Sequence, residues 1–155
     1  MPPWSDVALQ IADTCPGTRV RQVSRVMTKI YDDALRPLGI QSSQMSLLVA
    51  VARFGDAGAT ITGLARVLAM DRTTLTRNIR PLEADGLVRV ARSPDDKRAS
   101  IVVLTRAGER MLEAVHPLWT KATAHIRATL GATRMDDLRA SLNDTLTRLR
   151  APDHD

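Results

Sequence analysis

The sequence has few of the residues that build disulfide frameworks, metal centres or catalytic sites. One cysteine, Cys15, and three histidines occur in 155 residues, so no intramolecular disulfide can form, which is typical of a reducing compartment. There is no HExxH, no CxxC pair, no G-x-S-x-G elbow and no phosphate-cradling glycine loop. Glu113 and His116 share a helix face, but two ligands are too few for a metal. We therefore expect no enzyme, no metal and no cofactor.

Long apolar runs are absent as well. Nowhere do about 18 uncharged apolar residues follow one another, and the first residues lack the basic start and apolar stretch of a secretory signal. A length of 155 residues is that of one ordinary domain. These features predict a cytoplasmic protein with one domain, residues 1–155, and no membrane partner.

Positive charge is in excess. The chain has 22 basic and 17 acidic residues, a net charge of +5 and a pI near 10.3. Such an excess favours a polyanionic partner, either nucleic acid or an acidic surface. Almost all of the basic residues are arginine, whose planar guanidinium matches phosphate and guanine edges.

Apolar residues recur every three or four positions through 18–38, which predicts a first long helix ended by Pro37 and Gly39. A second helix is expected to begin after Ser42 or Ser43 and to continue to Ala52. Because it is apolar nearly all round, we expect it to be buried.

Two short amphipathic helices follow. Thr60 and Asp71 are placed to cap them, and only Ala69 and Met70 lie between them. Two helices joined by so short a turn form a helix-turn-helix, whose second helix can enter a groove of DNA.

Alternation in 87–92 and an apolar run in 100–105 predict two strands around a charged turn, that is, a wing. The predicted fold class is therefore mainly α with a small β-hairpin wing. In this interpretation 42–106 form a winged helix-turn-helix, and 1–38 and 107–151 form a flanking helical dimerisation region.

The last third of the chain is again helical. A long helix is expected from Ala107 to about Leu130, bent by Pro117, and a closing helix from about Thr133. The closing helix carries an apolar stripe that must be covered: Met135, Leu138, Leu142, Leu146 and Leu149. We expect a second copy to cover it, and the twofold axis of such a homodimer matches a pseudo-palindromic site on double-stranded DNA.

The second helix of the helix-turn-helix predicts the DNA contacts. Leu75, Ile79 and Leu82 define its inward face. Its outward side and margin are short, polar and cationic: Arg72, Thr73, Thr74, Thr76, Arg77 and Arg80. Threonines suit a base edge or a thymine methyl, Arg77 suits guanine, and the other arginines suit phosphate. The alternative is an ordinary solvated helix face.

The tip of the wing predicts a second contact. Lys97 and Arg98 are expected to enter the minor groove, and Asp96 to hold Arg98 in place. A charged tip is also common on any exposed hairpin, so this interpretation has a plain alternative.

The stretch ITGLARVLAMDRTTLTRNIRPLEADGLVRVARSPDDKRASIVVLTRAGE resembles the core of the multiple antibiotic resistance regulator (MarR) family. Its most recognisable signature is Asp96-x-Arg98 followed by Leu104-Thr105-x-x-Gly108. The resemblance implies a homodimeric, winged-helix transcriptional repressor, with the helix from Asp71 in the major groove and Arg98 in the minor groove.

The resemblance also implies release of DNA by a small, often aromatic, ligand. The residues that would line its pocket are Met27, Tyr31, Met45, Leu48, His116 and Trp119, and simple core filling is the equal alternative for them. Two further alternatives stay open: an oxidant sensor acting through Cys15, and a winged-helix module that binds only protein.

Overall fold

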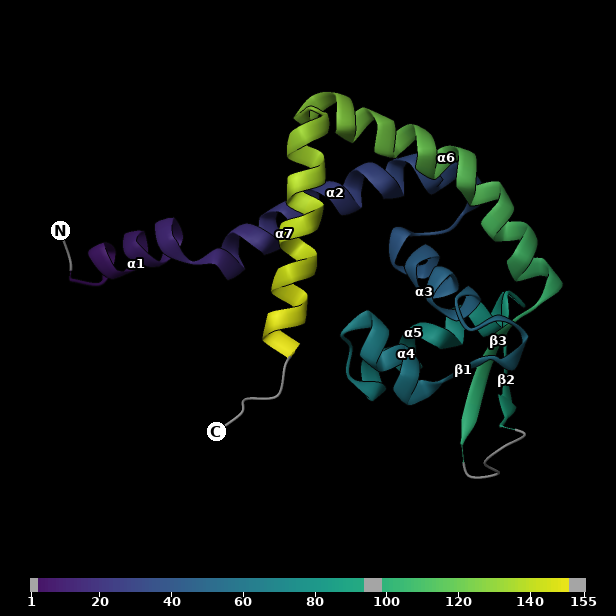
Figure 1. The fold of residues 1–155 in the computed structure, drawn as a ribbon. Coiled ribbons are helices and arrows are strands. Elements are labelled where there is room, and N and C mark those ends of the chain that lie inside the picture. Colours follow the sequence, from purple (N-terminus) through teal and green to yellow (C-terminus); the bar gives the residue numbers. More distant parts are fainter. Residues whose placement is uncertain (1–2, 94–98, 151–155) are drawn as a thin grey trace.

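The computed structural model describes residues 3–93 and 99–150 as a mainly helical chain with one small sheet (Figure 1). The helices are α1 (Pro3–Thr14), α2 (Pro16–Leu35), α3 (Ser42–Ala52), α4 (Ile61–Leu68), α5 (Arg72–Ala84), α6 (Arg106–Leu130) and α7 (Ala132–Arg150). The strands are β1 (Ala59–Thr60), β2 (Val88–Arg92) and β3 (Ser100–Leu104). This element order confirms the predicted fold class.

The sheet is antiparallel with the order β1-β3-β2. Val88 lies opposite Leu104 and Arg92 opposite Ser100, so β2 and β3 form the predicted hairpin. β1 was not predicted, because two residues are too few to show alternation and its pairing with β3 is non-local. β1 joins the hairpin to the helix-turn-helix through Ala59, which lies opposite Val102.

The core lies between α3, α4, α5 and the sheet. Its largest fully buried side chains include Leu48, Leu64, Leu75, Leu82 and Val102. Burying an aliphatic side chain of this size contributes about 1.5–3 kcal/mol relative to leaving it exposed. We call residues 42–104 the winged-helix unit, since this part of the chain buries its own apolar residues.

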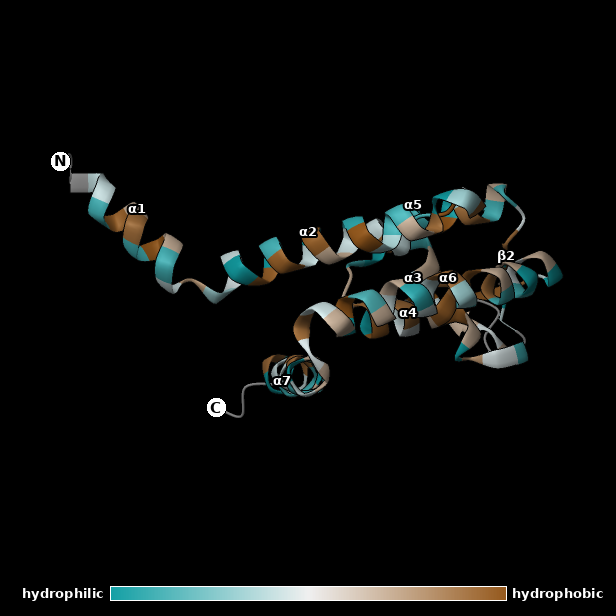
Figure 2. Ribbon diagram, turned by 90° about the horizontal axis from the view of Figure 1, so that it is seen from above, coloured by the Kyte–Doolittle hydropathy of each residue, from teal (hydrophilic) through white to brown (hydrophobic). Residues whose placement is uncertain are grey.

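α1 is a helix that the sequence analysis did not predict. Trp4, Val7 and Ile11 have helical spacing and are exposed. Figures 1 and 2 show α1 pointing away from the rest of the molecule beyond the outer end of α2, and Figure 2 shows a bend between the two helices. We call α1, the first half of α2 and α7 the terminal helices.

Two of the predicted helix caps are confirmed. Thr60 Oγ1 accepts a hydrogen bond from the Gly63 backbone N–H at 3.0 Å, which starts α4. Asp71 Oδ1 accepts one from the Thr74 backbone N–H at 2.8 Å, which starts α5. Each cap satisfies a backbone donor that has no partner inside the helix.

The predicted cap of α3 is wrong. Gln41 precedes the helix, and its backbone N–H donates to Gln44 Oε1 at 2.9 Å. Ser42 is already helical, and its N–H donates to Asp32 Oδ1 at 2.7 Å. The acceptor therefore comes from α2, ten residues earlier, and ties the two helices together.

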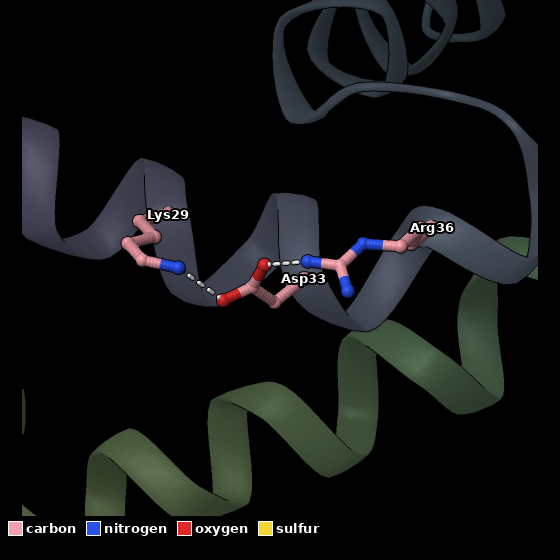
Figure 3. A network of polar contacts seen from close by, with 3 residues as sticks. All are labelled: Lys29, Asp33 and Arg36. Atoms are coloured by element: carbon pink, nitrogen blue, oxygen red, sulfur yellow. Dashed lines mark hydrogen bonds and ion pairs between the residues drawn. The ribbon is translucent and has the colours of Figure 1, made fainter.

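The first long helix ends as the sequence predicts. α2 passes into a single turn of 3-10 helix over Arg36–Leu38, and Gly39 closes it in the left-handed region with φ 66°. Asp33 bridges Lys29 and Arg36 on the exposed side of this end (Figure 3). The Lys29 ammonium, followed by the Arg36 guanidinium, lowers the pKa of the Asp33 carboxyl. Exposed pairs of this kind stabilise a helix only slightly.

Neither internal proline ends its helix. α5 continues past Pro81 and α6 past Pro117. Figure 1 shows α6 arched over the molecule, as the predicted bend requires. Arg127 near the end of α6 contacts both carboxylate oxygens of Asp136 in α7, at 3.1 and 2.9 Å, and this pair braces the corner between the two helices.

Candidate nucleic-acid interface

The outward face of α5 is a short cationic face of the winged-helix unit. Leu75, Ile79 and Leu82 are buried, as predicted, and turn the opposite side of the helix to solvent. Five exposed residues on that side line one surface hollow: Arg72, Thr73, Thr76, Arg77 and Arg80. The structure therefore brings together all but one of the α5 residues assigned from the sequence.

Thr74 is the exception and is placed differently. It is half-buried, and its hydroxyl donates to Asp71 Oδ2 at 2.6 Å. The same carboxylate accepts the Thr74 backbone N–H, and these two bonds lower the pKa of Asp71. The Thr74 side chain is thus engaged in the cap of α5.

The turn between α4 and α5 fixes the direction of α5. Ala69 adopts the left-handed region with φ 53°, and the Met70 backbone N–H donates to the Ala65 carbonyl at 3.0 Å. Asn78 on α5 places its side-chain amide 3.8 Å from Met70 Sδ. A non-glycine residue in this region is uncommon, so the surrounding packing must hold the turn.

The wing is tied to both neighbouring helices. Thr105 Oγ1 donates to the Gly86 carbonyl at 2.6 Å and accepts the Gly108 backbone N–H at 3.1 Å, which caps α6. A Cβ on Gly108 would lie 2.1 Å from the Leu87 carbonyl oxygen, so only glycine lets α6 approach β2 this closely. The Leu104-Thr105-x-x-Gly108 signature therefore has a structural role: it fixes the wing against α6.

The predicted wing contacts Asp96, Lys97 and Arg98 lie outside the described residues. The strand β2 leading to them carries two exposed cations, Arg89 and Arg92, which the sequence analysis did not assign to the site. Because they are three residues apart, their side chains point to opposite faces of the strand, and no spacing in the sequence assigns both to the site.

Two pockets lie beside α3 and share Met45, Ser46 and Trp119. The first, of about 580 Å³, lies between α2, α3, α6 and α7 and includes Met27 and Tyr31. The second, of about 500 Å³, lies between α3, α4 and α6 and includes His116. We call them the α2 pocket and the α4 pocket.

The residues assigned to a ligand pocket are therefore divided between these two pockets. His116 and Trp119 have ring centroids 6.2 Å apart and tilted by 32°. Tyr31 Oη lies 3.2 Å from Thr123 Oγ1 and links α2 to α6. Leu48 lines neither pocket: it is 0% exposed, because its side of α3 faces the core, and its assignment was wrong.

Cys15 precedes α2 at the N-cap position and is half-buried. Hydrogen bonds from the Thr18 hydroxyl and backbone lower the pKa of the Cys15 thiol, and Arg21 adds to the effect. Arg21 is not evident from the sequence as a neighbour of Cys15, because the two residues come close only once the first turns of α2 have formed.

Neither a metal site nor a membrane span occurs in the described part of the chain. No group of three or more His, Cys, Asp or Glu in 3–93 and 99–150 is placed to hold a metal ion. No helix in these same ranges is both long and apolar enough to cross a membrane.

A family model described as "MarR family" matches residues 38–99. The chain is 33% identical over 98 residues to the uncharacterized HTH-type transcriptional regulator YwoH of Bacillus subtilis, covering 63% of this chain and 69% of YwoH.

Solved structures are similar over more of the chain. The MosR transcriptional regulator of M. tuberculosis in complex with DNA has a TM-score of 0.77 and 31% identity, over 88% of this chain and 97% of MosR. A cysteine-to-serine mutant of E. coli MarR complexed with operator DNA has a TM-score of 0.79 and 27% identity, over 88% of this chain and 97% of MarR.

Proposed function

The chain belongs to the MarR family, and we propose that it is a homodimeric transcriptional regulator that binds specific sites on duplex DNA. The outward face of α5 carries this proposal. Five polar and cationic residues of one helix share an exposed hollow, beside a hairpin that is fixed to the same unit. The relatives of this chain are transcriptional regulators and not enzymes, so we assign no catalytic activity to it.

The side chains of α5 divide into two roles. Arg77 is the candidate for paired hydrogen bonds to guanine in the major groove, and Thr73 and Thr76 face the neighbouring base edges. Arg72 and Arg80 lie one turn before and one turn after Thr76 and reach toward phosphate. Lys97 and Arg98 in the wing turn remain candidates for the minor groove, with Asp96 as their support.

A second copy of the chain is the partner that covers the terminal helices. On α7, Leu142, Leu146 and Leu149 are exposed, and so are Val20 and Val23 on α2. Apolar rows of this length on two helices are unusual for a free monomer surface. Pairing across a twofold axis sets two α5 helices about 34 Å apart, which favours a pseudo-palindromic operator.

We further propose that the protein represses its target and that a small aromatic ligand releases it from DNA. The apolar α2 pocket lies between the terminal helices and α3, the apolar α4 pocket lies between α6 and the winged-helix unit, and Trp119 borders both. A ligand that prefers one angle between these parts shifts the spacing of the two α5 helices, and with it the affinity for DNA. Because chromosomal DNA lies in the cytoplasm of a bacterium, we propose that location.

Oxidant sensing through Cys15 is the second candidate, and one observation favours it. This thiol lies at a helix N-terminus and its pKa is lowered. A lower pKa raises the fraction of thiolate, which is the reactive form of cysteine. Oxidation there would alter the junction of α1 and α2, which belongs to the surface assigned to the second copy.

Electrophoretic mobility of genomic fragments, measured across salt concentrations, tests the DNA-binding proposal. We expect a subset of fragments to shift, with log K falling linearly against log salt at a slope of about −0.9 per phosphate neutralised. A module that binds only protein would shift no fragment preferentially at any salt concentration. Addition of peroxide, with Cys15→Ser as control, separates an oxidant sensor from a ligand-released repressor.

A further inference from the structure

The three threonines at the start of α5 present different groups to solvent. Thr74 donates its hydroxyl to Asp71 Oδ2, as described above. The Thr76 hydroxyl donates to the Arg72 backbone carbonyl at 2.8 Å. Within the described residues, Thr73 is exposed and its hydroxyl is not used in a hydrogen bond. Only one of the three therefore keeps a free hydroxyl donor.

Thr76 lies at the centre of the exposed hollow. Arg72 and Arg80 stand one turn to either side of it on the same face, and both have long side chains. A short residue between two long ones leaves a recess, so the helix backbone can approach a base edge most closely at Thr76. The hydroxyl hydrogen is directed at the helix backbone, and the γ-methyl is the group that remains for contact.

We propose that Thr76 is a specificity-determining residue that recognises the 5-methyl group of a thymine through its own methyl group. The proposal depends on the proposed function, since it names the chemistry of one contact in that interface. An arginine in the same position would select guanine, and a free hydroxyl would form hydrogen bonds with several different bases. A threonine whose hydroxyl is engaged selects by apolar contact, for which thymine has the matching group in the major groove.

The test starts with the full-length protein and an operator selected from a random duplex library. Each thymine of that operator is then replaced by deoxyuridine, which removes the 5-methyl group and leaves base pairing unchanged. For the wild type we expect a loss of about fourfold in affinity at one thymine in each half-site, and about 15-fold when both are replaced.

Three variants identify the responsible group. Thr76→Ser keeps the hydroxyl and removes the methyl, so it should bind thymine and uracil operators equally. Thr76→Val keeps the methyl shape and removes the hydroxyl, so it should retain the wild-type preference. Thr129→Ser on α6, whose hydroxyl also donates to the backbone carbonyl four residues earlier, is the matched control outside α5 and should also retain it. Serine, threonine and valine have similar helix propensities, and circular dichroism melting checks that each variant folds.

Each contrary outcome has one meaning. Equal affinity of the wild type for thymine and uracil at every position overturns the methyl contact, while DNA binding itself stands. A preference that survives in Thr76→Ser, or disappears in Thr76→Val, also overturns it, because another residue or the hydroxyl then reads the base. Failure to select any sequence from the library contradicts the proposed function and this inference together.

Discussion

The winged-helix unit and the terminal helices use apolar residues in opposite ways. In the winged-helix unit, Leu64 and Leu75 are fully buried within the chain. In the terminal helices, Trp4 is 70% exposed and Leu149 82% exposed. Figure 2 shows hydrophobic segments along the projecting α1 and α2. The first region is complete within one chain, whereas the second has the composition of an interface.

Polar contacts tie the second half of α2 to α3 and α6. The Asp32 carboxylate of α2 accepts the first backbone N–H of α3, and Tyr31 contacts Thr123 of α6. α2 is therefore held to the winged-helix unit at one end, while its other end extends into the proposed dimer. We expect a change at the dimer surface to be transmitted to α3 through these contacts.

The largest expected effect contrasts a core residue with an exposed one. Leu64→Ala should lower the free energy of unfolding by about 2–5 kcal/mol, because it leaves a cavity in the core that the surrounding side chains fill only in part. Leu9→Ala on α1 should change it by less than about 0.5 kcal/mol. Urea unfolding followed by circular dichroism measures both, and equal losses would remove the distinction between the regions.

A pair of helical glycines gives the next contrast. Gly108→Ala should destabilise the protein by about 2 kcal/mol, because the new Cβ overlaps the Leu87 carbonyl. Gly17→Ala, whose Cβ would meet only ordinary contacts at 3.7 Å, should stabilise α2 by up to about 1 kcal/mol. Thermal unfolding measures the stability of both variants relative to the wild type. An unchanged stability of Gly108→Ala would mean that α6 is free to move away from β2.

The dimer surface predicts an effect on association and not on folding. Leu146→Arg should weaken dimerisation about 30-fold, since a charge replaces an apolar contact. Ala140→Arg adds the same charge to a different side of α7 and serves as the control. Analytical ultracentrifugation over a range of concentrations compares them; an unchanged dimer in Leu146→Arg would contradict the assignment of the α7 stripe.

The smallest effect concerns the junction of α1 and α2. Because hydrogen bonds from Thr18 lower the pKa of Cys15, its thiolate forms at lower pH than an ordinary thiol of pKa 9.0. The rate of alkylation by iodoacetamide should therefore rise with pH around a midpoint below 9.0, and Thr18→Val should move that midpoint upward. Thr28→Val, farther along α2, should leave it in place. A wild-type midpoint at or above 9.0 would refute the shift.

Sequence reasoning succeeded where the signal is local. The caps at Thr60 and Asp71 and the spacing of Leu75, Ile79 and Leu82 identified α5 and its exposed face, because each depends on residues three or four apart. The strands of the wing were predicted from alternation and an apolar run, which are also local patterns.

Prediction from the sequence failed where a structural feature is caused by residues elsewhere in the chain. The start of α3 depends on Asp32 from α2, and β1 exists only because β3 lies beside it. Leu48 was assigned to a pocket from the family resemblance. Because α3 is apolar nearly all round, periodicity could not correct this by distinguishing the core side from the side of Met45 and Val49. α1 is a different case, because Trp4, Val7 and Ile11 have a local helical spacing that was not used in the prediction.

The central claim is that the outward face of α5 reads duplex DNA. Fluorescence anisotropy with the selected operator and single-base-pair variants tests it most directly. Arg77→Ala should lose about tenfold to 100-fold of the discrimination at one base pair, while Arg134→Ala on α7 keeps it. Undiminished discrimination by Arg77→Ala at every base pair would contradict the placement of the reading surface on this helix.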